Sequence, residues 1–311
     1  MSGRVVALTG GVGGAKLVLG LTQIMPPDQI TTIVNTGDDF EHLGLWISPD
    51  IDTLLYTLSG KANPVLGWGR EGESWSFMEA VKTLGGADWF QLGDGDLALH
   101  VLRSHALSQG RSLSNITRDF AQGWGIGVHV LPMSDRPVPT FVQTDEGELP
   151  FQDYFVRRRC EPVAQAVRFD GAEDALAAPG VVDAILSPAT EAIIIAPSNP
   201  YLSIDPILAI PQIRAALQQT RTPIVAVSPI VGGAAVKGPT AKLMGEMGVS
   251  VTPATVAAHY AGIIDAMLVD ERDQPIDLAI PHAAADTLMN STEDKARVAR
   301  DALELARRVA Q

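Results

Sequence analysis

The stretch VVALTGGVGGAKL, residues 5–17, decides the fold of this 311-residue chain. The apolar run Val5–Leu8 enters a glycine-rich loop and continues into the helix-like segment Ala15–Ile24. Glycines between a strand and a helix let the backbone approach a ligand closely, and the N-terminus of a helix favours an anion. The stretch therefore predicts a phosphate- or nucleotide-binding loop, with a merely tight turn as the alternative. Its candidate ligand-binding residues are Gly10, Gly11, Gly13, Gly14 and Lys16.

The spacing of this loop differs from two common nucleotide-binding motifs. It is not the dinucleotide motif G-x-G-x-x-G, because Lys16 occupies the last glycine position after Gly11 and Gly13. It is not a Walker A loop either, since that motif requires G-x-x-x-x-G-K-[ST]. The first mismatch argues against an NAD-dependent dehydrogenase.

Three further apolar runs end in the same abrupt way, at polar or glycine-rich loops: Thr32–Val34, Ala192–Ala196 and Ile224–Val227. Continuous apolar strands predict a parallel sheet that is covered on both faces. Helix-like segments follow them, at Ile207–Gln218, Thr240–Met247 and Ala254–Ala261. The pattern predicts an α/β fold with a Rossmann-like, mostly parallel sheet, in which ligands bind at the carboxyl ends of the strands.

The middle of the chain follows a different pattern. Residues from Trp75 to Gly123 read as helices, and residues from Gly127 to Leu149 alternate like a hairpin with a turn at residues 145–147. We expect residues 1–60 and 166–311 to form the nucleotide-binding core, and residues 61–165 to form a helical and hairpin insertion that covers the site. A last helix is expected at Thr292–Val309, with Ser291 or Thr292 as its N-cap.

The acidity of the chain limits its partners. The formal net charge is −13, so we expect neither nucleic acid nor an anionic membrane to bind through the general field of the protein. Phosphates must then be bound locally, by backbone N–H groups, a few Lys or Arg side chains, or a bridging metal. The apolar run at the N-terminus is too short for a signal peptide, and a cytoplasmic location is expected.

Four aspartates follow the second strand within fifteen residues: Asp38, Asp39, Asp50 and Asp52. Mg²⁺ prefers oxygen ligands and often takes one or two carboxylates together with substrate phosphates. Asp38, Asp39 and Asp52 are therefore the candidate metal ligands, with Asn35 beside them as a ligand-binding residue. For Asp50 the favoured interpretation is support for the start of a helix.

Other loops add candidates for substrate binding. Asp94 and Asp96 stand before a predicted helix, where they bind a ligand or cap the helix. Ser198 and Asn199 lie in a loop stiffened by two prolines, and Lys237 either neutralises a phosphate or is simply exposed. The histidines show no metal-binding or catalytic spacing; His100 and His105 are five residues apart, and His42 is the one retained as a candidate.

Taken together, the sequence resembles the CofD family, the 2-phospholactate transferases of coenzyme F-420 synthesis, whose actinobacterial members are called FbiA. The resemblance covers nearly the whole chain in the expected order. It is carried by TGGVGGAKL (Thr9–Leu17), NTGDDFEHLGLWISPDIDTLLYTLSG (Asn35–Gly60), QLGDGDLALH (Gln91–His100), PMSDRPVPTFVQTDEGELPFQDYFV (Pro132–Val156), APSNPYLSIDPIL (Ala196–Leu208) and SPIVGGAAVKGP (Ser228–Pro239).

The resemblance implies a homodimer and a Mg²⁺-dependent reaction of two substrates. A guanosine diphosphate conjugate of lactate, enolpyruvate or glycerate would give its phospho-acid group to the deazaflavin alcohol Fo, and GMP would leave. The Gly10–Gly14 loop and Asn199 are expected at the guanosine diphosphate part, and Asp38, Asp39 and Asp52 at the metal and the Fo hydroxyl. Asp52 and Asp39 are the candidate catalytic residues, because Asp52 matches the position that holds Fo and its carboxylate suits proton transfer.

One departure from the family pattern concerns the acceptor. Gly95 stands where the family has Arg or Lys between two aspartates, a cation that helps to hold Fo, and Arg103 or Lys82 are candidates to replace it. The main alternative function keeps the fold: a nucleotide- or UDP-sugar-binding regulator of the YvcK type, which shares the glycine loop but has no transferase activity.

Overall fold

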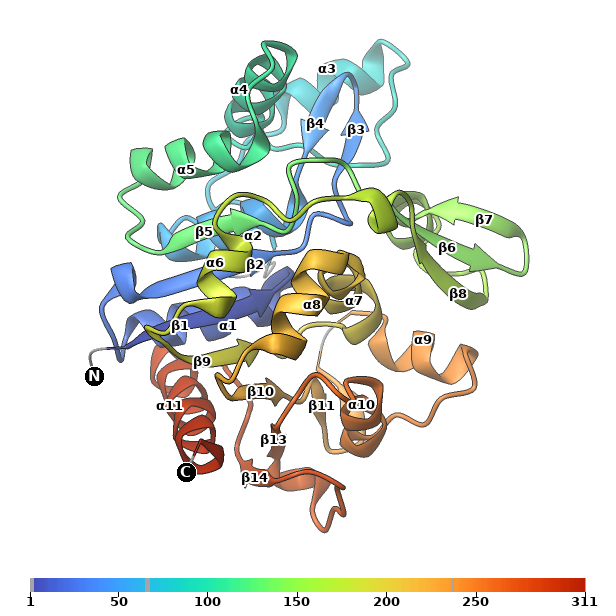
Figure 1. Ribbon diagram of the computed structural model, residues 1–311. Coiled ribbons are helices and arrows are strands. Elements are labelled where there is room, and N and C mark those ends of the chain that lie inside the picture. The colour runs from blue at the N-terminus through green and yellow to red at the C-terminus, as the bar shows by residue number, and fades with distance from the viewer. Residues whose placement is uncertain (1–2, 65–67, 237, 311) are drawn as a thin grey trace.

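The computed structural model describes residues 3–64, 68–236 and 238–310. Its centre is a seven-stranded sheet in the order β14-β13-β10-β9-β1-β2-β5, and each neighbouring pair is parallel (Figure 1). The strands are β1 (Arg4–Thr9), β2 (Ile30–Val34), β5 (His129–Pro132), β9 (Thr190–Ile195), β10 (Ile224–Val227), β13 (Ala266–Asp270) and β14 (His282–Ala285). The α/β class with a Rossmann-like sheet is confirmed.

The central strands are apolar without alternation because both of their faces are covered. All residues of β2, β10 and β13 are buried. Within β1, Val5 and Ala7 join the core on one face of the sheet, whereas Val6 and Leu8 join the core on the other. Side chains that alternate between two cores explain why the sequence shows continuous apolar runs.

Helices cover the two faces as separate layers. One face carries α1 (Gly11–Thr22), α2 (Pro49–Leu58), α5 (Leu113–Gly123) and α11 (Thr292–Val309). The other carries α6 (Val181–Leu186), α7 (Asp205–Ala209), α8 (Pro211–Gln219) and α10 (Pro253–His259). Ser291 caps α11 and forms a capping box with Asp294, as the sequence suggested.

The order of the strands reverses direction at β1. From β1 the chain adds β2 and β5 on one side, and from β9 it adds β10, β13 and β14 on the other. In an open parallel sheet, such a reversal leaves a crevice beyond the carboxyl ends of the strands, where ligands bind. The glycine loop follows β1 and the Pro197–Pro200 loop follows β9, so both lie at this point.

Smaller elements surround the crevice. The hairpin β3 (Phe40–His42) and β4 (Leu45–Ile47) packs with α3 (Ser76–Thr83) around a small core of Ile47, Met78 and Leu92. Next to them lies α4 (Leu97–Ser108), and a three-stranded antiparallel sheet projects on another side (Figure 1). Its strands are β6 (Thr140–Thr144), β7 (Gly147–Pro150) and β8 (Ala164–Phe169), in the order β7-β6-β8. The remaining elements are α9 (Thr240–Glu246) and the pair β11 (Ile230–Val231) and β12 (Ala234–Ala235).

The structure differs from the sequence expectation at two elements. The hairpin expected over residues 127–149 is wrong in its first half, because residues 129–132 form β5 and pair in parallel with β2; the true hairpin is β6–β7. The chain therefore returns to the main sheet within residues 61–165. The helix expected at Ile207–Gln218 is two helices, since Ile210 precedes Pro211 and takes an extended conformation.

Within the described ranges, no helix combines the length and the apolar character needed to cross a membrane.

The crossing of α1 and α11 depends on a glycine, which gives a test of the fold. A Cβ on Gly20 would lie 2.1 Å from the carbonyl oxygen of Lys295. We expect Gly20→Ala to lower the free energy of unfolding by about 1–3 kcal/mol, because backbone rather than a flexible side chain must move. Urea denaturation measures this.

Gly245→Ala is the matched control. Gly245 also lies in a helix, and a Cβ there would meet no described atom within 4 Å. Alanine should therefore stabilise α9 by about 0.5–1 kcal/mol. Equal effects of the two substitutions would contradict the close crossing.

Candidate active site

Three loops meet at the crevice and are joined by hydrogen bonds. The hydroxyl of Ser198, after β9, donates to the carbonyl oxygen of Gly10 at 2.7 Å and accepts from the N–H of Gly10 at 3.3 Å. The N–H of Asn35, after β2, donates to the carbonyl oxygen of Thr9 at 2.9 Å. The ends of β1, β2 and β9 thus form one unit, as the convergence of polar loops predicted.

The glycine loop is held tightly by its neighbours. A Cβ on Gly13 would lie 2.6 Å from the carbonyl oxygen of Pro197, and one on Gly14 would lie 2.0 Å from the hydroxyl of Thr9. Gly11 has a φ of +64°, in the left-handed region that favours glycine. Packing and backbone conformation therefore both require these glycines, whatever ligand the loop binds.

Asp50 occupies the place at the start of α1 where an anion is favoured. Its Oδ1 accepts the N–H of Gly11 at 2.7 Å, although Asp50 belongs to the first turn of α2. The sequence interpretation as helix support missed this contact across 39 residues. A carboxylate bound at a helix N-terminus shows that the loop attracts anions.

The side-chain amide of Asn35 joins two buried carboxylates. Its Nδ2 donates to Asp38 Oδ1 at 3.0 Å and to Asp50 Oδ2 at 2.9 Å, and its Oδ1 accepts the N–H of Gly37 at 2.7 Å. Asn35 itself is fully buried. The expected grouping of Asn35 with Asp38 is present, and Asp50 completes it.

Asp39 lies beside this group with one oxygen engaged. Ser48 Oγ donates to Asp39 Oδ2 at 2.6 Å, and Trp46 Nε1 donates to the same oxygen at 3.2 Å. Among the described residues, Asp39 Oδ1 has no hydrogen-bond partner although it is buried. A buried carboxylate oxygen without a partner is costly, so it marks a position for a ligand or cation.

The environment of these acids disfavours their charged forms. Burial, and then the charge of Asp50, raises the pKa of Asp38 well above its usual value. Burial likewise raises the pKa of Asp39 well above the usual value, against the hydrogen bond from Ser48. Burial raises the pKa of Asp50 to about 6. Perturbed carboxylates gathered in a crevice are typical of an active site that binds a cation or transfers protons.

Asp52 belongs to a second network under α4. Arg103, 1% exposed, donates from Nη1 to Asp52 Oδ2 at 3.1 Å and forms a second, close bond from Nη2 to Oδ1. His100 Nδ1 lies 3.7 Å from Asp52 Oδ2, and His100 Nε2 lies 3.1 Å from Asp96 Oδ2. The hydroxyl of Tyr56 donates to Asp96 Oδ1. The carboxylate of Asp52 is thus oriented by a guanidinium.

His100 was missed in the sequence, although a signal was present. Asp96 and His100 are four residues apart, a spacing that brings two side chains together on one face of a helix. The five-residue spacing between His100 and His105 does not do so. In the described part of the chain, Asp52, Asp96 and His100 are the trio of acid and histidine side chains close enough to share one ion, with ligand atoms within 4.8 Å of one another. Asp38, Asp39 and Asp52 do not form such a trio by themselves.

The remaining candidates have other or additional partners. Asp94 accepts hydrogen bonds from the N–H groups of Ser76 and Phe77 at 3.1 and 3.0 Å. It therefore caps the start of α3, and not the helix that follows it in the sequence, as the capping alternative had expected. Lys16 Nζ donates to the carbonyl oxygen of Met289 at 2.8 Å. His42 packs edge-on against Trp89 with ring centroids 5.0 Å apart, and burial lowers its pKa.

The side-chain amide of Asn199 is engaged on one side only. Its Oδ1 accepts the N–H groups of Tyr201 and Leu202 at 3.0 and 3.2 Å, and so begins the helical turn Pro200–Ile204. The buried Nδ2 has no partner among the residues described. Lys237 lies outside the described residues.

Gly95 has a cation beside it, although it carries none. A Cβ on Gly95 would lie 1.9 Å from Nη1 of Arg70, so the guanidinium of Arg70 fills the space where a side chain of residue 95 would begin. Glu73 holds the arrangement, because it accepts from Arg70 Nη1 at 3.2 Å and from the N–H of Gly95 at 2.6 Å. The side chain of Arg70 is 33% exposed. A positive charge therefore already lies beside Gly95, and neither Arg103, which is bound to Asp52, nor Lys82 is needed to supply one.

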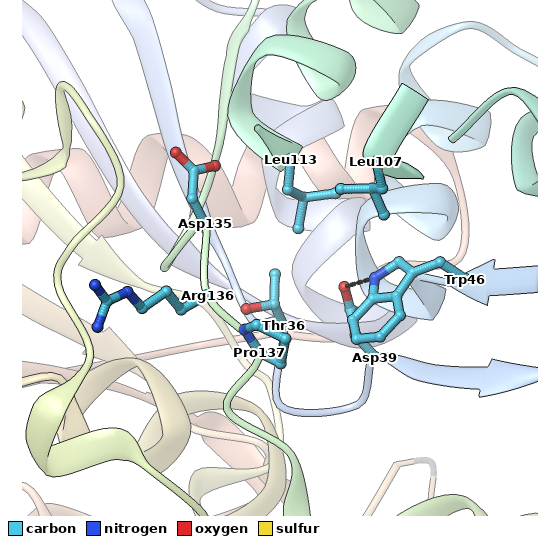
Figure 2. A pocket seen from close by; sticks show the side chains of 8 residues that line it. All are labelled: Thr36, Asp39, Trp46, Leu107, Leu113, Asp135, Arg136 and Pro137. Carbon is cyan, nitrogen blue, oxygen red and sulfur yellow. Dashed lines mark hydrogen bonds between the residues drawn. The ribbon is translucent and has the colours of Figure 1, made fainter. Parts of the chain in front are cut away.

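A cavity of about 240 Å³ opens beside Asp39 (Figure 2). It lies between the loop after β2, strand β4, the facing ends of α4 and α5, and the loop after β5. The residues that line it are Thr36, Asp39, Trp46, Leu107, Leu113, Asp135, Arg136 and Pro137.

A Rossmann-like sheet with buried carboxylates at its reversal point defines a ligand-binding α/β protein, and comparison with known proteins places it among the transferases. The chain belongs to the family described as 2-phospho-L-lactate transferase CofD, whose model matches residues 5–309. It is thus a transferase of the coenzyme F-420 pathway, as the resemblance implied, and a dehydrogenase is not supported.

Two named relatives match over nearly their whole length. The chain is 43% identical to a phosphoenolpyruvate transferase of Kitasatospora aureofaciens, with 98% of each chain covered. It is 39% identical to a 2-phospho-L-lactate transferase of Methanosarcina mazei, with 94% of this chain and 97% of the relative covered. Among solved structures, a member of the UPF0052 family from Bacillus halodurans matches with a TM-score of 0.64 at 18% identity, over 97% of this chain and 99% of that chain. That similarity shows the fold alone.

The raised pKa of Asp50 predicts a pH dependence of stability. The folded state retains a proton on Asp50 up to about pH 6, whereas the unfolded chain releases it near pH 4, so stability falls as pH rises between these values. Asp50→Asn removes this loss. Its free energy of unfolding relative to the wild type should increase between pH 4 and pH 6 by on the order of 2 kcal/mol and then level off.

Urea denaturation at several pH values, in buffer without divalent cations, measures that difference. Asp294→Asn is the control, because the pKa of Asp294 is lowered to about 2 in the folded protein. Its folded carboxylate stays ionised throughout the range, and the difference from the wild type should change little above pH 4. A constant difference between Asp50→Asn and the wild type would contradict the burial of a strained carboxylate at this position.

The Asp52–Arg103 pair predicts a strongly non-additive double-mutant cycle. Arg103→Met leaves Asp52 buried without its guanidinium and should cost about 3–5 kcal/mol of unfolding free energy. Arg103→Met combined with Asp52→Asn should recover a large part of that loss, because no uncompensated charge remains. Additive effects in chemical denaturation would show that the two side chains are independent.

Proposed function

We propose that the protein transfers a phospho-acid group from its guanosine diphosphate conjugate to the primary hydroxyl of the ribityl chain of Fo. A bond forms between the Fo oxygen and the phosphorus that carries the acid. The bond from that phosphorus to the bridging oxygen breaks, and GMP leaves with this oxygen. The observation that carries the proposal is the group of buried carboxylates beside the glycine loop, in a chain of the CofD family.

The donor would lie along the glycine loop. The N–H groups of Gly10 and Gly11 are bound by Ser198 and Asp50, so the donor would meet the N–H groups of residues 12–14 at the N-terminus of α1. Asn199 Nδ2, which is buried and has no partner in the described chain, would donate to the ligand. We assign the guanosine diphosphate part to Gly10, Gly11, Gly13, Gly14 and Asn199, with Ser198 shaping the loop. Lys16 and Asn35 are assigned to the edge of this subsite, and Lys237 is proposed as a phosphate-binding residue on the sequence pattern alone.

A divalent cation is needed because two anionic groups must meet here. Asp38, Asp39 and Asp50 lie where the diphosphate has to approach, and Arg103 is already bound by Asp52. The residues fit Mg²⁺: they offer carboxylate oxygens, and Asp39 Oδ1 has no other partner in the part of the chain described. We propose Asp38 and Asp39 as its holders together with Asp50, which the structure adds, whereas Asp52, the third holder expected from the sequence, is bound on both oxygens by Arg103. Bound Mg²⁺ would neutralise charge on the phosphates.

Asp39 suits the proton transfer. Its Oδ1 has no partner in the described chain and would border both the cation and the Fo hydroxyl, so Asp39 is the carboxylate we assign to accepting the hydroxyl proton as the new bond forms. Asp52, the other catalytic candidate, is bound on both oxygens by Arg103, and we assign it to holding the acceptor side of the site in place. Asp96 and Tyr56 extend that support toward Gly95 and Arg70.

The relatives favour one donor. Identity is 43% to a relative named phosphoenolpyruvate transferase and 39% to one named 2-phospho-L-lactate transferase. We therefore propose the enolpyruvate conjugate as the preferred donor, ahead of those of lactate and glycerate. A cytoplasmic homodimer is proposed with it, and light scattering after size exclusion tests the dimer.

A coupled assay tests the function. The protein is mixed with Fo, Mg²⁺, GTP, a guanylyltransferase and one of three acids: 2-phospholactate, phosphoenolpyruvate or 3-phosphoglycerate. We expect mass spectrometry to show the phosphoenolpyruvate product and GMP, and both to disappear with EDTA. Asp39→Asn should lower kcat by about 10²–10⁴-fold, because it removes the proton acceptor.

The control is a known transferase in the same mixture. If the control forms product and this protein forms none with any acid, the proposed reaction is wrong. A UDP-sugar that copurifies with the inactive protein would then support the YvcK-type regulator.

A further inference from the structure

The side chain of Gln152 reaches the loop that contains Asp38 and Asp39. Gln152 follows strand β7 and is 7% exposed, and its Nε2 donates to the backbone carbonyl oxygen of Asp38 at 3.1 Å. The two residues are 114 positions apart in the sequence. Gln152 belongs to the segment Pro132–Val156, which contributes to the family resemblance, and it has no part in the function proposed above. A buried amide directed at the acidic loop from another element needs an explanation.

This hydrogen bond fixes the peptide group between two residues that we propose as metal holders. The carbonyl group of Asp38 belongs to the peptide that links Asp38 to Asp39, and a peptide group is planar. Because its oxygen is held in one place, rotation of this peptide is limited. The directions of the two side chains beside it are limited as well. Gln152 therefore acts on the relative orientation of both carboxylates through the backbone.

A second bond connects the same loop to the same small sheet. The N–H of Thr140, at the start of β6, donates to the carbonyl oxygen of Gly37 at 2.8 Å. The approach is close, because a Cβ on Gly37 would lie 2.6 Å from Thr140 Oγ1. The acidic loop is thus held from outside, by β6 and by the turn that follows β7.

The segment around Gln152 is firmly packed. Phe151 and Tyr154 are buried in a small core that also contains Leu202, from the loop after β9, and Leu243 of α9. Tyr154 lies in a short π-helical turn, a feature that is frequent at functional sites. The core joins Gln152 to the side of the crevice formed by β9, while its amide holds the loop after β2.

The two carboxylates need such a restraint because like charges repel each other. Mg²⁺ is held by ionised carboxylates, whereas burial, followed by the charges of Asp50 and Asp39, raises the pKa of Asp38. If the loop were free to turn, repulsion would move the charges apart. The cation would then have to reorder the loop on binding, which lowers its affinity.

We propose that Gln152 is a positioning residue for the divalent cation, and that it keeps the carboxylates of Asp38 and Asp39 in the orientation that binds this ion. The inference rests on the proposed function for the presence of a cation at these carboxylates. Gln152 acts through the backbone of the loop and is assigned no contact with the cation or a substrate.

Gln152→Met tests the inference, because it keeps the length of the side chain and removes the donor. Mn²⁺ is the probe, and GDP replaces the diphosphate of the donor. The loss of the free Mn²⁺ signal in electron paramagnetic resonance, corrected for the loss with GDP alone, gives the affinity without turnover. We expect Gln152→Met to weaken Mn²⁺ binding by about tenfold or more, as is usual for residues that orient metal ligands.

Activity gives a second measurement. In the coupled assay, the Mg²⁺ concentration for half-maximal activity of Gln152→Met should rise by a similar factor. At saturating Mg²⁺ its kcat should stay within about twofold of the wild type, because the bound cation itself orders the loop. A variant that is merely less stable would not show this recovery.

Two variants of β6 separate positioning from stability. Gln143→Met makes the same substitution at an exposed residue and should change neither Mn²⁺ affinity nor stability. Val142→Ala removes apolar contacts from the buried core of the small sheet. It should lower the midpoint of urea denaturation at least as much as Gln152→Met does, with Mn²⁺ affinity unchanged.

The outcomes distinguish this inference from the proposed function. If the wild type and Gln152→Met bind Mn²⁺ equally well, Gln152 does not position the site. The same holds if Val142→Ala loses as much affinity as Gln152→Met, because the loss then reflects stability alone. If the wild type binds no Mn²⁺, the proposed cation is wrong and this inference fails with it. If the wild type binds Mn²⁺ but forms no product with any acid, only the proposed reaction fails.

Discussion

The amide of Asn35 is the interaction on which the rest of the site depends. With its NH₂ group it bridges the carboxylates of Asp38 and Asp50, and with its oxygen it fixes the turn at Gly37. Asp50 in turn holds the N–H of Gly11. One buried side chain therefore joins the glycine loop, the acidic loop and the start of α2, and it does so where burial makes every carboxylate costly to ionise.

The sheet explains why these groups meet. Reversal of the strand order at β1 leaves space between the ends of β1 and β9, and the acids on the loop after β2 border that space. The helices α4 and α5 border the site on the side of β2, and α4 brings Arg103 and His100 to Asp52. In the proposed reaction, donor and acceptor would meet at the boundary between the sheet and these helices.

Much of this arrangement could be predicted from the sequence. The strand–glycine–helix pattern of residues 5–17 and the apolar runs specify the parallel sheet, and the loop after β2 and the first turn of α2 contain the acids. The contacts of Asp50 with Gly11 and of Arg103 with Asp52 could not be predicted, because they join segments 39 and 51 residues apart that only tertiary packing brings together. For β5, a short partly alternating run was assigned to a hairpin, since its parallel partner lies far away in the sequence.

The placement of Arg70 against Gly95 has an evolutionary consequence. The two positions share one space, so a long side chain at residue 95 excludes the observed position of the guanidinium at residue 70. A lineage can hold a positive charge at this point from either segment, but the exchange requires two substitutions. Relatives should therefore show covariation, with small residues at one position accompanying a cation at the other. The charge would then be retained although the residue that carries it changes.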